Sequence, residues 1–437
     1  MKALYFFLLV APLFGGWKAG VATVDITPKE PVWLAGYAAR TRPSEGATQH
    51  IFVKALALED DAGAVSVLVT SDLLGFNAQM SRTVAGQVKQ KHGIPRERLI
   101  FNASHTHSAP VTSYVLRVAY PMADEQFEGC KRYTDWLLPR VVEVIGEAVN
   151  KRRPATLEFG QGLAGFAVNR RRVGHREYPG PIDPDVPVLR VTAEGKVIAV
   201  AFGYACHATV LDEHTVSGDW PGYAQEAVER ANPGAVALFV NGASADANPL
   251  PRRLQELAKR YGDTLAIEVG NVLQGKMKPV NGPLRAALDT VDVPFSKPPD
   301  RAEWERRKRE EKHFMNRQHA ELMLSIMQRE GKLPDKYPFT AQVWQFGKDL
   351  KMIVMAGEVV VDYALRFKKQ YGWNDTWIAG YSNDVFTYIP SLRVLREGGY
   401  EGGGAMIPYG LPSPFGAAVE EIIAEKFDEL VKRTSPE

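Results

Sequence analysis

The sequence predicts an α/β fold in which a mixed central sheet is flanked by helices and a metal site lies at strand ends. Short apolar runs end abruptly in polar or small residues, and helical patterns lie between them. Strands that alternate with helices are typical of α/β proteins. Several runs are followed directly by reactive residue types, which in such folds gather in loops just beyond the strand ends.

The apolar runs have the length and the Gly, Asn and Ser boundaries of buried strands. They cover residues 64–69, 99–101, 197–202, 236–240, 352–355 and 377–378. Helical patterns cover residues 81–92, 133–150, 223–231, 254–273 and 417–432. A loop rich in arginine, over residues 165–184, and a charged helical excursion over residues 298–336 interrupt this rhythm.

The first residues have the parts of a secretory signal. A single lysine precedes about a dozen apolar residues and a pair of glycines, a run too short to span a bilayer comfortably. We therefore expect residues 1–16 to be a signal peptide, the protein to be secreted or periplasmic, and residues 17–437 to form a single hydrolase domain. No other stretch predicts a transmembrane segment.

Charge and cysteine content restrict the remaining classes. The formal net charge is +2, so no basic field predicts a nucleic-acid partner. Two cysteines are too few for a disulfide framework. A single bridge between Cys130 and Cys206 stays open as an alternative, and we expect two unpaired buried thiols. Neighbours in a strand face opposite ways, so Cys206 should face the core and His207 the site.

Histidines after the predicted strands suggest a metal centre. In the segment Ser-His-Thr-His-Ser at residues 104–108, His105 and His107 are alternate residues of an extended chain and share a face. One can bind a metal while the other transfers protons. Either His207 or His214 could be a further ligand.

A carboxylate ligand completes many catalytic zinc sites. Glu358 follows an apolar strand and a glycine, but spacing alone does not favour it over Asp72, Asp219 or Asp246.

A set of modest motifs in a fixed order identifies a family. The motifs are GVATVDITP (20–28), GYA (36–38), His50, KALA (54–57), SHTHS (104–108), Asn169, Arg170, His207, SGD (217–219), GYA (222–224), GE (357–358), Tyr388 and YEGG (400–403). Together they make the chain resemble the catalytic domain of the neutral/alkaline non-lysosomal ceramidases, across nearly the whole length after residue 16.

The resemblance implies a set of roles. It implies that Zn²⁺ is bound by His105, His207, Glu358 and Tyr388. It also implies that His107 is the general acid/base, and that Arg170 and Tyr400 hold the oxygen of the scissile carbonyl. Within the arginine run 170–172, either of the other two arginines could take the place of Arg170.

The implied reaction is hydrolysis of an N-acyl, ceramide-like amide by zinc-activated water. The family has a Gly-Asp-Val-Ser-Pro-Asn stretch where residues 245–250 read Ala-Asp-Ala-Asn-Pro-Leu. Asn248 in the serine position disfavours a serine nucleophile. Two alternatives stay open: a hydrolase of smaller, non-lipid amides or esters, and a non-catalytic binding protein on the same fold.

Overall fold

The structure is a computed structural model that describes residues 16–112, 115–116, 118–172 and 179–436. The predicted signal peptide over residues 1–16 lies, except for Gly16, outside the described residues. Residues 173–178 of the arginine-rich loop also lie outside the described residues.

The main sheet is mixed and strongly curved, which confirms the predicted fold class. Its strands are β1 (Trp17–Asp25), β2 (Phe52–Glu59), β3 (Val65–Ser71), β4 (Leu99–Ala103), β5 (Arg153–Leu163), β7 (Asp185–Ala193), β8 (Lys196–Tyr204), β9 (Val236–Asn241) and β11 (Lys278–Val280). The order is β4-β3-β2-β1-β5-β7-β8-β9, with β11 beside β5. Only the edge pairs β3–β4 and β8–β9 are parallel.

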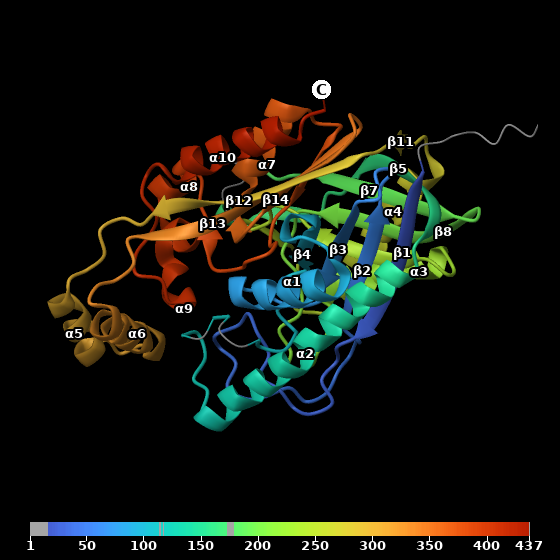
Figure 1. The fold of residues 1–437 in the computed structure, drawn as a ribbon. Helices are drawn as coiled ribbons and strands as arrows, with labels where there is room; N and C mark the ends of the chain where they lie inside the picture. Colours follow the sequence, from blue (N-terminus) through green and yellow to red (C-terminus); the bar gives the residue numbers. More distant parts are fainter. Residues whose placement is uncertain (1–15, 113–114, 117, 173–178, 437) are drawn as a thin grey trace, which may run out of the picture.

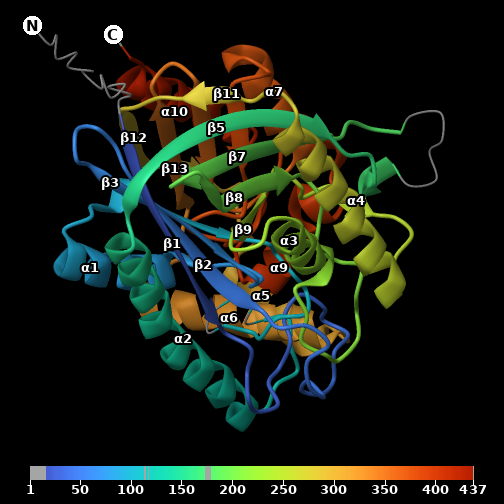
Figure 2. The same cartoon turned by 90° about the vertical axis from the view of Figure 1, so that its right-hand side faces the viewer.

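Curvature brings the two edges of this sheet together. Figure 2 shows β5 arching over β7 and β8 while β1 and β2 cross below. The side-chain oxygen of Asn102, in β4, accepts a 2.9 Å hydrogen bond from the backbone N–H of Asn241, in β9. The carboxyl ends of β4, β8 and β9 therefore lie close to one another, and their loops can share one site.

A second sheet packs face to face against the first and adds a layer that the sequence did not indicate. It has the order β12-β13-β14-β16, with β12 (Leu284–Pro294), β13 (Lys336–Phe346), β14 (Leu350–Met355) and β16 (Thr376–Ala379). Buried Leu238 and Ile100 of the first sheet share one apolar cluster with Trp344 and Met352 of the second. Burying this apolar surface is the main force that joins the two layers.

Helices cover the outer faces of both sheets (Figure 1). They are α1 (Ala78–His92), α2 (Asp124–Asn150), α3 (Asp219–Ala231), α4 (Gln255–Gln274), α7 (Val361–Tyr371) and α10 (Val419–Thr434). The helices α1 and α2 pack on β1–β4, and α3 and α4 pack on β7–β9. The helices α7 and α10 cover the second sheet.

Short elements shape the rim of the site. They are β6 (Ala167–Asn169), β10 (Ala247–Pro249), β15 (Glu358–Val359), β17 (Tyr388–Ile389), α8 (Leu392–Glu397), the π-helical turn η3 (Tyr400–Gly404) and α9 (Met406–Tyr409). The parallel register of β15 and β17 sets Glu358 beside Tyr388.

The charged excursion forms two helices, α5 (Arg301–Glu310) and α6 (Phe314–Glu330), outside the two sheets (Figure 1). Within the described part of the chain, no helix has both the length and the apolar character needed to cross a membrane. Both cysteines are free and buried, as expected.

Candidate metal centre

Two histidines at strand ends present bare ring nitrogens to one point. His105 follows β4, and His207 follows β8. The Nδ1 of His105 lies 2.6 Å from the carbonyl oxygen of Leu74, and the Nδ1 of His207 lies 2.7 Å from that of Ser244. A carbonyl oxygen only accepts, so each Nδ1 carries a proton, and in a neutral ring it is the only one. In that form, each Nε2 carries a lone pair that faces the site.

Glu358 and Tyr388 bring oxygen atoms to the same point. The Oε2 of Glu358 lies 3.2 Å from the Nε2 of both histidines, and the hydroxyl of Tyr388 lies 3.2 Å from the Nε2 of His207. With neutral rings, neither Nε2 has a proton to donate to Oε2 of Glu358. This carboxylate oxygen therefore has two close neighbours but no hydrogen bond. Lone pairs that converge in a buried place repel one another, and a cation relieves that repulsion.

Protonation states favour metal binding. Burial lowers the pKa of His207 to about 4, so the ring is neutral at pH 7. Burial alone would raise the pKa of Glu358, and a bound cation would hold its carboxylate in the ionised form. A neutral imidazole and an ionised carboxylate are the forms that coordinate zinc.

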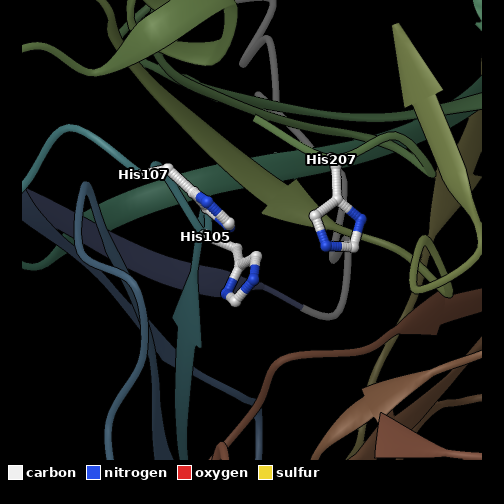
Figure 3. A group of neighbouring side chains, drawn as sticks. All are labelled: His105, His107 and His207. Atoms are coloured by element: carbon white, nitrogen blue, oxygen red, sulfur yellow. The ribbon is translucent and has the colours of Figure 1, made fainter. Parts of the chain in front are cut away.

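His107 completes a buried histidine group (Figure 3). The ring centroids of His105 and His107 are 5.0 Å apart, and candidate ligand atoms of His105, His107 and His207 all lie within 4.8 Å of one another. Both ring nitrogens of His107 are buried without a hydrogen-bond partner in the described structure. Burial lowers the pKa of His107 well below 6.5. The ring can therefore serve either as a further ligand or as a proton acceptor.

A glycine makes room for the His107 ring. Gly36 has φ of +91°, and a Cβ at this position would lie 2.2 Å from the Cγ of His107. The ring of Tyr37 contacts His107 edge-on, with 4.8 Å between the centroids. This part of the GYA motif therefore fixes the orientation of His107.

Arg170 differs from its two neighbours in the arginine run. Its Nη2 donates a 3.0 Å hydrogen bond to the hydroxyl of Tyr388, and its Nε donates one of 2.6 Å to Glu401. Arg171 pairs with the other oxygen of Glu401, and Arg172 pairs with Glu397. Of the three arginines, Arg170 is the one that the structure places against Tyr388.

Tyr400 lies at the edge of the centre. Its ring centroid is 5.1 Å from that of Tyr388, and 46% of the residue is exposed. It can therefore contact both the buried centre and a molecule that enters from solvent.

The other candidates from the sequence lie outside this centre. Asp72, Asp219 and Asp246 each accept backbone N–H hydrogen bonds that tie loops to their neighbours. Among the described residues, the histidine group contains His207 and not His214.

Sequence reasoning missed two tyrosines. The hydroxyl of Tyr409 donates a short hydrogen bond to Oε1 of Glu358, the oxygen that faces away from the histidines. The ring of Tyr381 lies 4.5 Å from that of His105, between centroids. Tyr381 comes shortly after the predicted strand at residues 377–378, but no motif distinguishes it from its neighbours, and Tyr409 follows no predicted strand.

Residues 17–249 match the family described as neutral/alkaline non-lysosomal ceramidase, N-terminal. The neutral ceramidases of Drosophila melanogaster and Drosophila pseudoobscura pseudoobscura are 24% and 23% identical to the chain over an alignment of 232 residues, and each match covers 49% of this chain. The match spans only 32% of each of these curated relatives.

Two solved structures share the fold. The crystal structure of neutral ceramidase from Pseudomonas aeruginosa has a TM-score of 0.73 at 20% identity, and covers 97% of this chain and 75% of its own. A ceramidase complexed with C2 also has a TM-score of 0.73, at 17% identity, over 96% of this chain and 75% of its own.

Proposed function

The chain belongs to the neutral/alkaline non-lysosomal ceramidase family, and on that basis we propose that it is an exported, zinc-dependent amidohydrolase that cleaves a ceramide-like N-acyl amide. The observation that carries the proposal is the convergence of two imidazole Nε2 atoms and a carboxylate oxygen at one buried point. The proposed location is secreted or periplasmic.

The donor set fits zinc. His105, His207, Glu358 and Tyr388 would hold the ion, which matches the mixed nitrogen and oxygen ligands of catalytic zinc sites. The unpartnered Oε2 of Glu358 supports this fit, because a buried ionised oxygen without a hydrogen bond needs a cation. When bound, zinc activates water near neutral pH and polarises a carbonyl oxygen.

The other residues supply proton transfer and charge stabilisation. His107, neutral and without a partner, takes a proton from the attacking water and gives it to the leaving nitrogen. Arg170 and Tyr400 hold the carbonyl oxygen as negative charge develops on it. Glu401 fixes the guanidinium of Arg170 at 2.6 Å, so the arginine is oriented before the substrate binds.

Hydrolysis assays test the proposal. The purified protein should cleave N-acyl sphingosine, lose activity in a chelator, and regain it with added zinc. Turnover of short N-acyl amines or esters only would favour the alternative, a hydrolase of smaller non-lipid substrates. Zinc binding without any turnover would favour a binding protein. Fractionation of cells that express the full chain tests export.

A further inference from the structure

An apolar pocket of about 350 Å³ adjoins the candidate metal centre. Residues that line it include Gly36, Tyr37, Leu116, Met315, Tyr400 and Ile407. Met315 belongs to α6, so the charged excursion supplies one wall of the pocket. It packs on the apolar cluster that contains Leu116. The pocket therefore has a fixed apolar lining of the kind that takes an alkyl chain.

A second pocket of about 560 Å³ is also lined by Tyr400 and is strongly charged. Its lining includes the three arginines 170–172, Glu397, Tyr400 and Glu401. These groups are joined by ion pairs, among them Arg171 to Glu401 at 2.6 Å and Arg172 to Glu397 at 2.6 Å.

The two pockets share Tyr400, and each has a lining residue that contacts the candidate metal centre. Tyr400 lines both of them and packs on Tyr388. Gly36, in the apolar pocket, lies against the ring of His107. Arg170, in the charged pocket, donates to Tyr388. An amide held at Tyr400 would thus have one apolar and one charged environment for its two substituents.

We propose that the preferred substrate is a single-chain amide, with its one alkyl chain in the apolar pocket and the short substituent on the other side of the amide in the charged pocket. The inference rests on the proposed amidase function and narrows its substrate class. A second alkyl chain would have to lie against the arginine and glutamate side chains and remove water from them, which is costly. At about 350 Å³, the apolar pocket is also near the lower end of the range for ligand sites.

Substrate pairs test this directly on the zinc-loaded full chain. N-octanoyl-ethanolamine and N-acetyl-octylamine each carry one chain, on opposite sides of the amide, and N-octanoyl-sphingosine carries two. We expect the faster of the single-chain amides to exceed N-octanoyl-sphingosine at least about tenfold in kcat/KM, in the same detergent. Each methylene added within the pocket should raise kcat/KM roughly fourfold, from the transfer free energy of a buried CH₂.

Faster cleavage of N-octanoyl-sphingosine would overturn this inference and leave the proposed function standing. If the zinc-loaded protein cleaves none of the amides, both fail.

A pocket variant and a matched control test whether the alkyl chain of the substrate binds in the apolar pocket. Met315→Trp should lower the ratio of kcat/KM for the eight-carbon amide to that for N-acetyl-ethanolamine by about tenfold, because the indole fills space that the chain needs. Ser325→Trp introduces the same side chain at an exposed position of α6 and should keep the wild-type ratio. An unchanged ratio in Met315→Trp, with zinc content equal to wild type, would overturn the assignment.

Discussion

The hydrogen bond from Tyr409 to Glu358 should contribute to zinc affinity. It holds one carboxylate oxygen so that the other faces the two histidines, and Glu358 is only 2% exposed. Tyr409→Phe removes this hydroxyl and keeps the ring. A hydrogen bond to a charged group contributes about 1.5–3 kcal/mol. Loss of a hydrogen-bond partner of a metal ligand typically weakens metal binding about 10- to 100-fold, or about 1.4–2.7 kcal/mol. This range agrees with the contribution of the hydrogen bond.

Competition with a chelating zinc indicator measures the change. Tyr261→Phe is the matched control, since the Tyr261 hydroxyl donates to the carbonyl of Pro251, outside the metal centre. We expect weaker zinc binding in Tyr409→Phe alone. Wild-type affinity in Tyr409→Phe, within twofold, would refute the idea that Tyr409 orients Glu358.

Three further variants test other parts of the account. Burial raises the pKa of Asp219 to about 7, so the native state keeps a proton that the unfolded chain loses near 3.8. Stability should therefore fall as pH rises from 4 to 7, by at most about 1.4 kcal/mol per pH unit from this group. Urea titrations should show a smaller decline in Asp219→Asn, and equal slopes would contradict the assignment. His107→Ala should retain zinc in metal analysis while kcat falls about 10²- to 10⁴-fold; loss of zinc would make His107 a ligand. Glu401→Gln removes the buried carboxylate that pairs with both Arg170 and Arg171, so urea titration should show about 3 kcal/mol lower stability, and a change below about 1 kcal/mol would argue against this pairing.

The strands that carry the site could be predicted from sequence because they are buried on both faces. The runs at residues 99–101 and 197–202 are continuous and apolar, and they correspond to β4 and β8. The long strands β5 and β12 were not predicted. Each is only partly buried, and charged or small residues interrupt its apolar pattern.

The candidate site also has residues that the sequence predicts and residues that it does not. His105 and His207 are marked by their positions after strands, whereas Glu358 and Tyr388 meet only through the pairing of two-residue strands far apart in sequence. The spacing of residues along the sequence does not predict such a contact, so only the resemblance selected Glu358 and Tyr388 as ligands. Tyr409 was missed because its contact with Glu358 depends on how a four-residue helix packs.

The central claim is that His105, His207 and Glu358 bind a metal ion together, and the metal content of the purified protein tests it most directly. We predict about one zinc per chain in the wild type and in His214→Ala, and loss of zinc in both His105→Ala and His207→Ala. No bound metal after zinc supplementation, or metal retained in either of the last two variants, would contradict the account.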